Sequence, residues 1–321
     1  ELRSIGIQPD VIVARSDYVV GEDLRDKIAL FCDVDARSVI PLTTTSILYE
    51  VPLLLEREGL GEHVLTRLGL KARKKPEWAE WERMIAAERK DRPIVRIALV
   101  GKYVELQDAY MSVREAVRHA ALSAGVKAEI IWLHSAELEK GKGFAELEMA
   151  DGVIVPGGFG SRGIEGKIAA AHYVNSTEFN INTPHPVIDL LPEQRGIGDM
   201  GGTMRLGLYP CVLKRGTIAK HAYNCNRVEE RHRHRFEFNN TYREIFGEHG
   251  MVFSGLSPDD RLVEIAELKD HPFMLGCQFH PEFLSRPNRP HPLFKAFLEA
   301  VAAKAEARMK VGKQSVAQGT D

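Results

Sequence analysis

The stretch Cys277-Gln278-Phe279-His280-Pro281-Glu282 places an imidazole and a carboxylate two residues apart, at the end of an apolar run. The run Phe273–Phe279 predicts a strand, in which His280 and Glu282 share one face and Cys277 points to the other. A histidine held by a carboxylate can take a proton from a thiol or hydroxyl and return it to a leaving amine. The pair is a candidate acid–base unit; the alternative is a strand-end histidine beside a solvated glutamate.

A second candidate part is the glycine-rich turn at the end of the apolar stretch Asp151–Gly160. Backbone N–H groups exposed in such a turn can hold an oxyanion. The turn also matches the dinucleotide-binding pattern, through three glycines that begin at Gly158 and end at Gly163. We reject a nicotinamide site because Pro156 and Gly157 separate the strand from the pattern, and because no strand with an acidic end follows about 20 positions later.

Several long segments of the chain resemble one family in the same order. The glutamine amidotransferase domain of CTP synthase is matched by VPGGFGSRGIEGKIAAAHY, NSTEF, MGGTMRLG, ERHRHRFEFNN and CQFHPEF. The late part of the synthetase domain of that enzyme is matched by ELRSIGIQPDVIVARS and KIALFC, so the similarity runs from residue 1 to about residue 300. The resemblance implies an α/β fold with a doubly wound, mostly parallel sheet, preceded by a partial α/β synthetase domain.

The resemblance also implies an activity and a set of site residues. The family makes CTP from UTP, ATP and glutamine-derived ammonia, uses Mg²⁺ with ATP, takes GTP as an activator and forms homotetramers. A cysteine forms a glutamyl thioester, with His280 as acid–base and Glu282 as its orienter. An ammonium and a carboxylate on glutamine suit an acidic and a guanidinium partner. The implied glutamine-binding residues are Gly158, Glu178 and Arg235, and the implied nucleotide-binding residues are Lys27, Thr43, Thr44 and Thr45.

One part of the family pattern is missing. Family members have a strand, a nucleophile elbow Gly-x-Cys-x-Gly and a helix between the segments that resemble Ile168–Tyr173 and Asn175–Phe179. Here Val174 follows Tyr173 directly, and neither Gly-x-Cys-x-Gly nor Gly-x-Ser-x-Gly occurs in the chain. The missing elements need roughly 30–40 residues. The sequence therefore predicts the base without its nucleophile.

None of the four cysteines is expected to replace that nucleophile. Cys277 is predicted to point away from His280, and Cys32 and Cys211 follow or lie in apolar runs, where a cysteine is a small core side chain. Cys225 lies in a predicted loop without the strand–turn–helix context that exposes a nucleophile. We expect the chain as it stands to be inactive as a glutaminase.

The synthetase side is also incomplete in this sequence. No Gly-x-x-x-x-Gly-Lys-Ser/Thr loop is present to hold ATP phosphates, so no cofactor is expected in this chain itself. A degenerate subunit or assembly module that binds glutamine or nucleotide without turnover is one alternative. Another class I glutamine amidotransferase is a second, and the N-terminal segment and RHRHRFE argue against it.

Composition argues against several other classes of binding partner. The 321 residues suggest about two domains, and a formal net charge of −2 argues against nucleic acid or an anionic membrane surface as the main partner. No apolar run of about 18 residues is present, and the unpaired spacing of four cysteines favours a reducing, cytoplasmic location. His232 and His234 could bind a metal, but no third ligand is recognisable, so no metal is expected.

The order of the elements predicts four regions. These are a synthetase fragment at 1–75, a linker and docking helix at 76–93, an amidotransferase domain at 94–302 interrupted at 173/174, and a flexible tail at 303–321. The docking helix is indicated by Trp78, Trp81 and Ile85 at helical spacing. A βαβαβ run is predicted by strands at Ile94–Val100, Glu129–Leu133 and Gly152–Val155 and a helical stripe through Val113, Val117, Ala120 and Ala124; the first region has a strand at Val11–Ala14 and a helix at Leu24–Phe31.

Overall fold

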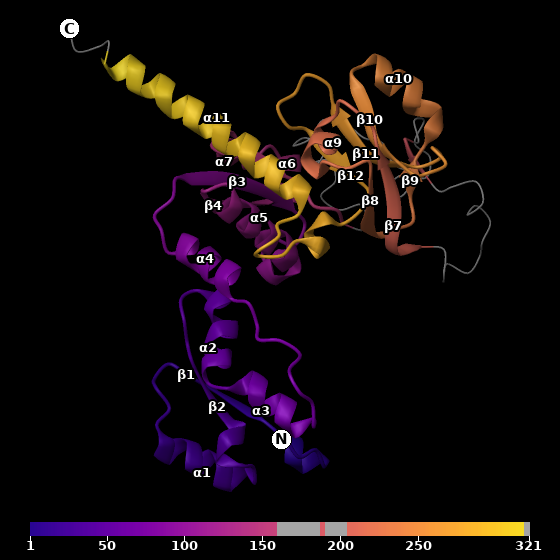
Figure 1. Ribbon diagram of the computed structural model, residues 1–321. Coiled ribbons are helices and arrows are strands. Elements are labelled where there is room, and N and C mark those ends of the chain that lie inside the picture. Colours follow the sequence, from indigo (N-terminus) through magenta and orange to yellow (C-terminus); the bar gives the residue numbers. More distant parts are fainter. Residues whose placement is uncertain (159–186, 190–203, 318–321) are drawn as a thin grey trace. The chain divides into compact units, whose positions relative to one another are not determined.

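The computed structural model describes residues 1–158, 187–189 and 204–317. The chain forms two compact units, Glu1–Lys90 and Asp91–Asp321 (Figure 1). The described residues form one sheet in the first unit and three in the second, each with its own helices, so each unit is treated by itself below.

The first unit is built on a two-stranded parallel sheet. Its strands β1 and β2 pair in register from Ile12 against Val39, and Val39 and Ile40 are buried beneath the helices. The predicted first strand and first helix are confirmed. The elements are β1 (Ile12–Ser16), β2 (Val39–Thr43), α1 (Glu22–Cys32), α2 (Val51–Arg57), α3 (Leu60–Arg67) and α4 (Ala79–Glu88), with short 3₁₀ turns at Leu2–Ile5, Ala36–Ser38 and Leu48–Glu50.

Helix α4 is the helix expected from the tryptophan spacing, and it packs within the first unit. The indole N–H of Trp81 donates to the Tyr49 carbonyl oxygen at 2.6 Å, and the two rings meet edge to face. Met84 and Ile85 are buried on the same helix. The helix is therefore fixed by one apolar face and one hydrogen bond to the turn before α2.

The second unit begins with a parallel sheet of strand order β4-β3-β5. Strand β3 is buried on both faces, because Val95, Ile97 and Leu99 join one apolar cluster while Ala98 and Val100 join another. This is the doubly wound α/β arrangement predicted from the strand–helix alternation, and the fold class is confirmed. The elements are β3 (Ile94–Gly101), β4 (Lys127–His134), β5 (Gly152–Ile154), α5 (Met111–Ser123), α6 (Ser135–Glu139) and α7 (Phe144–Glu148), with a 3₁₀ turn at Gln107–Tyr110.

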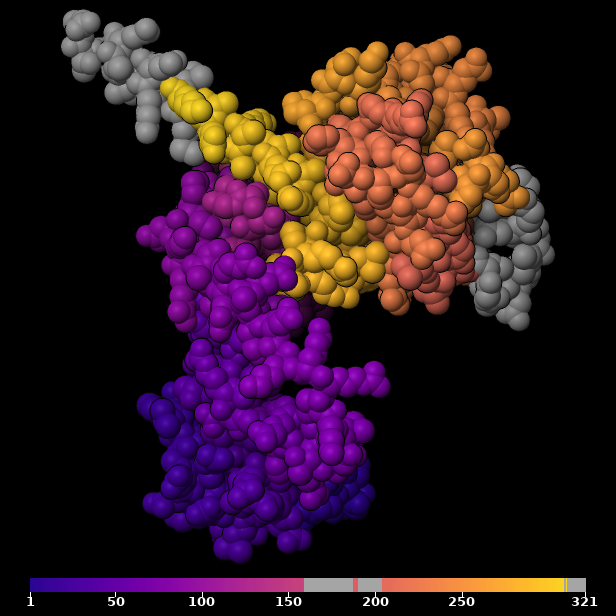
Figure 2. Space-filling model, viewed as in Figure 1, coloured from indigo at the N-terminus to yellow at the C-terminus, as the bar shows by residue number. Residues whose placement is uncertain are grey.

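Helix α11 (Pro292–Ala317) covers the same face of the parallel sheet as α5. Its atoms, yellow in Figure 2, lie against both the first part of the second unit and the orange second sheet. A Cβ atom at Gly152 of β5 would lie 2.6 Å from Val301 and 2.8 Å from Phe297, so glycine permits the close approach of strand and helix.

The helix continues beyond residue 302, where the sequence predicted a flexible tail. Ala305 is 4% exposed in the core, and Arg308 Nη2 lies 2.9 Å from Asp151 Oδ1. The polar composition concealed this packing, because one small apolar residue per turn is sufficient for a helix that lies on a core already formed.

A second sheet of five strands, in the order β12-β11-β10-β7-β8, is antiparallel. We did not predict it, because its strands alternate polar and apolar residues only imperfectly. The elements of this part are β7 (Arg205–Leu213), β8 (Arg227–His234), β10 (Met251–Leu256), β11 (Val263–Leu268), β12 (Leu275–Cys277), the pair β6 (Ile188–Asp189) and β9 (Glu237–Phe238), the helices α9 (Ile218–Tyr223) and α10 (Arg243–Glu248), and 3₁₀ turns at Asn240–Tyr242 and Pro281–Leu284.

The described helices include none that is both long enough and apolar enough to cross a membrane.

Candidate functional site

The predicted contact between His280 and Glu282 is present, on a 3₁₀ turn, and its acid–base role stays a prediction. His280 Nδ1 lies 2.8 Å from Glu282 Oε1, and the two side chains are 29% and 13% exposed. The imidazole also stacks on Phe283, with ring centroids 5.1 Å apart. Because a carboxylate only accepts, Nδ1 carries the proton of the neutral ring, and Nε2 is left as its basic atom.

The reason for this pairing differs from the prediction. The predicted strand Phe273–Phe279 is shorter, since β12 covers only Leu275–Cys277. His280 is the N-cap residue of the 3₁₀ turn and Pro281 is its first residue, so the turn rather than strand alternation brings the imidazole to Glu282. The His280 N–H donates to the Arg231 carbonyl oxygen at 2.8 Å, which anchors the turn to β8.

The surroundings of two cysteines in the second sheet disfavour the reactive thiolate. Cys211 is fully buried in the apolar cluster of the second sheet, and its burial, with nearby Glu264 and Glu230, raises the pKa of its thiol to about 12. Cys277 packs against the same cluster, and burial raises the pKa of its thiol well above the ordinary value. Cys225 lies in the loop after α9 and is partly buried, as is Cys32 at the end of α1. A thiol that stays protonated does not attack a carbonyl.

The predicted glutamine-binding residues fall in three places. Gly158 is exposed beyond the carboxyl end of β5, where ligands bind in doubly wound sheets. Arg235 is partly buried and lies between β8 and β9, four residues along the chain from the Arg231 carbonyl that holds the His280 turn. Glu178 lies outside the described residues. The glutamine-binding roles stay a prediction.

The predicted nucleotide-binding residues lie in the first unit. Lys27 is exposed on α1, and Thr43 is the last residue of β2. The Thr44 N–H donates to the Ser16 carbonyl oxygen at 2.9 Å, and the Thr45 hydroxyl donates to Glu50. The threonines therefore follow the carboxyl end of a parallel strand, the usual position for a ligand, and their nucleotide role stays a prediction.

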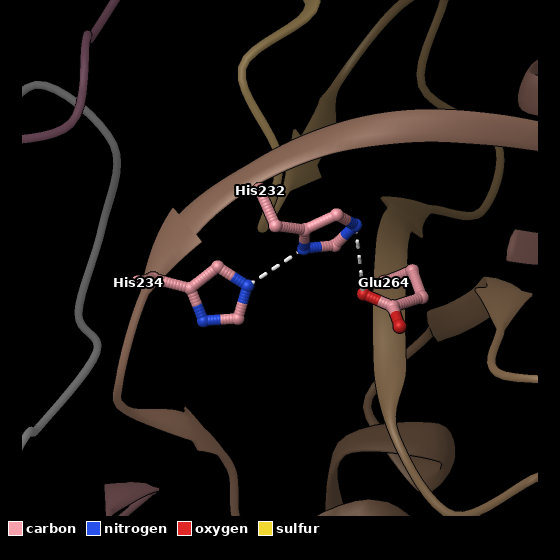
Figure 3. A group of neighbouring side chains, drawn as sticks. All are labelled: His232, His234 and Glu264. Atoms are coloured by element: carbon pink, nitrogen blue, oxygen red, sulfur yellow. Dashed lines mark hydrogen bonds and ion pairs between the residues drawn. The ribbon is translucent and has the colours of Figure 1, made fainter. Parts of the chain in front are cut away.

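A buried polar cluster lies under the second sheet, and sequence reasoning missed most of it. His232 and His234 face inward from β8, and His232 Nδ1 lies 2.7 Å from His234 Nε2. On the other side, His232 Nε2 lies 3.7 Å from Glu264 Oε2 of β11 (Figure 3). Arg205 of β7 contacts Glu264 at 2.8 and 3.2 Å and Glu237 at 3.2 Å.

Burial sets the charges in this cluster. It lowers the pKa of His232 to about 3 and that of His234 to about 4, and the positive charge of Arg205 adds to both shifts. Burial also raises the pKa of Glu237 to about 7, although Arg205 opposes the rise. Both imidazoles are therefore neutral at neutral pH, and the Arg205–Glu264 pair carries the fixed charges.

Glu264 is the third ligand-type residue that the sequence did not reveal next to His232 and His234. The three side chains nevertheless do not converge on one point. Figure 3 shows the ring of His232 between His234 and Glu264, with its two nitrogens turned in opposite directions. A structural zinc site needs about four donors directed at one centre. Glu264 also binds Arg205, and its 3.7 Å contact with His232 is too long for a hydrogen bond, so the arrangement is a row of polar contacts.

Two further buried histidines support the turn. His291 Nε2 and the Tyr223 hydroxyl reach the same Glu230 oxygen, at 3.0 and 2.6 Å. His119 Nδ1 lies 3.0 Å from the Ser285 hydroxyl, just after the 3₁₀ turn. These residues gave no motif in the sequence; the signal that could have found them is an acidic or imidazole side chain inside an otherwise buried element, which requires a partner.

Comparisons with known families and solved structures agree with the α/β fold described above. Residues 105–300 match the family Glutamine amidotransferase class-I, and residues 1–70 match the family CTP synthase N-terminus. Among solved structures, the glutaminase domain of Trypanosoma brucei CTPS with bound acivicin is similar, with a TM-score of 0.60 and 33% sequence identity. That similarity covers 65% of this chain and 94% of the solved one.

Curated relatives extend the similarity to both units. A CTP synthase of Dehalococcoides mccartyi is 52% identical over 331 residues, covering 94% of this chain and 61% of the relative. A CTP synthase of Thermomicrobium roseum is 54% identical over 329 residues, covering 93% of this chain and 59% of the relative. The chain thus spans about 60% of the length of these relatives. It belongs to the class-I glutamine amidotransferase family, on the branch of the CTP synthases.

Proposed function

We propose that this chain is the glutamine-handling part of a CTP-forming ligase. The whole enzyme would hydrolyse glutamine and use the ammonia, with ATP, to convert UTP to CTP. The observation that carries the proposal is the His280–Glu282 pair at 2.8 Å, on a turn that is hydrogen-bonded to β8. The names of relatives that match both units support the pyrimidine nucleotide substrates.

In this proposal each described residue has a limited task. Glu282 holds the proton on Nδ1, so that Nε2 of His280 can take a proton from a nucleophile and return it to the departing ammonia. Arg235 would pair with the α-carboxylate of glutamine. Backbone N–H groups near Gly158 would face the developing oxyanion. The nucleophile itself is the cysteine that the sequence lacks.

Without that cysteine, we propose that the chain as it stands does not hydrolyse glutamine. Cys211 and Cys277 are held as protonated thiols, and no Gly-x-Cys-x-Gly occurs in the sequence. The alignment with the Dehalococcoides mccartyi relative extends over 331 residues although this chain has 321, so the relative carries residues without a counterpart here. This supports missing residues somewhere in the aligned part of the chain, and we propose the Tyr173–Val174 junction because both of its flanks resemble the family.

For nucleotide, we propose only contacts with residues of the first unit. Lys27 and the threonines Thr43 to Thr45 would contact nucleotide, but no glycine-rich phosphate loop occurs in the sequence. The residues present do not form a complete ATP–Mg²⁺ site, and no catalytic step is assigned to those groups. Activation by GTP, a homotetramer and a cytoplasmic location follow in this proposal from the family resemblance.

A second candidate function is a non-catalytic module that binds glutamine or nucleotide. The buried, protonated cysteines favour it for the chain as it stands. Ammonia release from glutamine by the purified chain, beside His280→Ala, separates the two. Turnover that His280→Ala abolishes would overturn the inactive assignment and reveal a different nucleophile. Sequencing the gene across the Tyr173–Val174 junction should find an insert with Gly-x-Cys-x-Gly; a continuous reading frame in verified transcript would contradict it.

A further inference from the structure

Strand β8 supports both halves of the proposed glutamine site. The His280 N–H donates to the Arg231 carbonyl oxygen at 2.8 Å, and Arg235 follows the last residue of the strand. Between these two points the side chains of His232 and His234 face inward, where His232 is fully buried. A buried side chain on this inward face of β8 can therefore influence the positions of both His280 and Arg235.

The hydrogen bonds assign a tautomer to each of these histidines. His234 Nδ1 lies 3.0 Å from the Phe236 carbonyl oxygen, which can only accept, so His234 carries its proton on Nδ1. Its Nε2 is then an acceptor, and His232 must donate from Nδ1 across 2.7 Å. Both rings are therefore in the Nδ1–H form, and His232 Nε2 has no hydrogen-bond partner among the described residues.

The hydrogen bonds of His234 hold the backbone on both sides of Arg235. The His234 ring reaches from residue 234 to the carbonyl of residue 236, so it bridges the backbone on both sides of the arginine. At the far end, Glu264 is fixed by two contacts to Arg205 and lies 3.7 Å from His232. The hydrogen bonds therefore run from His232 through His234 to the backbone around Arg235, and the buried Arg205–Glu264 pair lies beside His232 without a hydrogen bond to it.

The ring of His232 also touches the residue before the catalytic histidine. It meets Phe279 edge to face, with centroids 5.7 Å apart, and it meets Tyr209 edge to face, with centroids 5.5 Å apart. Phe279 is 4% exposed. A buried ring in contact with two aromatic rings has little freedom to move, so its orientation bears on the start of the 3₁₀ turn.

We propose that His232 and His234 are positioning residues of the glutamine site. Their hydrogen bonds fix the backbone around Arg235, and the contact of His232 with Phe279 fixes the turn that carries His280. The inference rests on the proposed function for the roles of Arg235 and His280, and it adds two residues that touch neither substrate nor nucleophile. The neutral form of both rings keeps additional positive charge away from His280.

Two variants of His232 separate positioning from simple core filling. In His232→Asn the amide lies where Nδ1 was, so it still donates to His234 Nε2. In His232→Gln the amide reaches the place of Nε2, so the donor to His234 is lost. Both changes remove the imidazole and its contact with Phe279, so they differ mainly in the hydrogen bond.

Nuclear magnetic resonance of the ¹⁵N-labelled chain provides the readout. The wild-type protein should show Nδ1–H forms for His232 and His234. The backbone signal of Arg235 should keep its position in His232→Asn and move in His232→Gln, while the His280 ring signals should move in both. The indole signal of Trp132, in the parallel sheet, serves as the folding control. Nε2–H tautomers in the wild type, or identical Arg235 signals in the two variants, would overturn the inference.

Glutamine titration of the same proteins tests the link to the site. We expect His232→Gln to weaken glutamine binding roughly fivefold to tenfold relative to His232→Asn, the effect of one lost hydrogen bond. Equal affinity of the two variants would overturn the positioning role. Failure of the wild type to bind glutamine, with the Arg235 signal still moving in His232→Gln alone, would count against the proposed function and leave the coupling within β8 established.

Discussion

Two histidine–glutamate pairs lie close together in the second unit and differ in almost every respect except chemistry. His280 and Glu282 are two residues apart, partly exposed and 2.8 Å from each other. His232 and Glu264 come from different strands, are fully buried and lie 3.7 Å apart. The first pair leaves one ring nitrogen for a reactant, whereas the second holds both nitrogens within the protein. Exposure and the second partner, rather than residue type, distinguish the pair that we propose for acid–base chemistry from the pair that belongs to the core.

The exposed pair should matter most once a nucleophile is present. In a chain with a Gly-x-Cys-x-Gly segment inserted between Tyr173 and Val174, His280→Ala should lower kcat for glutamine hydrolysis roughly 10⁴-fold or more, because the cysteine loses its base. Ammonia release measures this. His221→Ala, at an exposed position on α9, is the matched control. A loss below tenfold would mean that the pair is not the acid–base unit.

Glu282→Gln in the same restored chain should cost about 10²- to 10⁴-fold in kcat. The glutamine side chain keeps the shape but can present an N–H to Nδ1, which favours the wrong tautomer of His280. The KM for glutamine should change little, because Glu282 contacts the base and not the substrate. An equal change in KM, with kcat preserved, would instead place Glu282 in substrate binding.

The buried pair should matter for stability instead. Among the described residues, Glu264→Ala leaves Arg205 with Glu237 as its charged partner, and breaking a buried pair costs about 3–5 kcal/mol. Urea unfolding followed by Trp132 fluorescence, with Trp78 and Trp81 changed to Phe, reports this unit. Glu229→Ala, at an exposed position on β8, should cost under about 0.5 kcal/mol. Equal losses in the two variants would refute the distinction.

The buried histidines should make the second unit sensitive to acid. Burial lowers the pKa of His119 to about 4, so the unfolded chain takes up the proton first as pH falls below about 6.5. Stability is therefore full above pH 6.5 and is lost as pH falls to about 4, by about 3 kcal/mol for this residue. Glu237, with its raised pKa of about 7, acts in the opposite sense, since its contribution is lost as pH rises from about 4.5 to 7.

Replacing His119 tests the direction in which the unfolding free energy changes with pH. His119→Asn should flatten the fall in unfolding free energy between pH 6.5 and 4 by about one proton, and Glu237→Gln should make the fall steeper. The same Trp132 unfolding assay measures both over a pH series. An unchanged slope in His119→Asn would show that the imidazole is protonated in the folded protein. His221→Asn serves as the exposed control.

The two pairs also show what a sequence can reveal. The spacing of His280 and Glu282 predicted their contact, since residues two apart remain close in either a strand or a turn, although the element itself was assigned incorrectly. The alternation from Ile94 to Val155 predicted the parallel sheet for the same reason: the signal is local. His232 and Glu264 could not be paired in this way, because their contact depends on strand order in an antiparallel sheet.

The burial of Cys211 could be predicted from the local sequence, whereas the packing of α11 could not. Cys211 was predicted to be in the core from its apolar neighbours, and its fully buried position confirms this. The sequence predicted a tail from residue 303, whereas α11 continues to Ala317 and packs through Ala305, because a polar helix can pack on a core that forms elsewhere, which composition alone does not show. The glutamine-binding and nucleotide-binding roles were carried by resemblance, and Glu178 lies outside the described residues.

The contact between Gly152 and α11 has a consequence for synthesis of the chain. Strand β5 precedes the glycine turn at Gly158, yet its packing partners Phe297 and Val301 are translated nearly half a chain later. Contacts of such long sequence separation form slowly. On the ribosome, α5 would cover only part of this face of the parallel sheet until α11 emerges, and during that interval the nascent chain is exposed to aggregation and to chaperones.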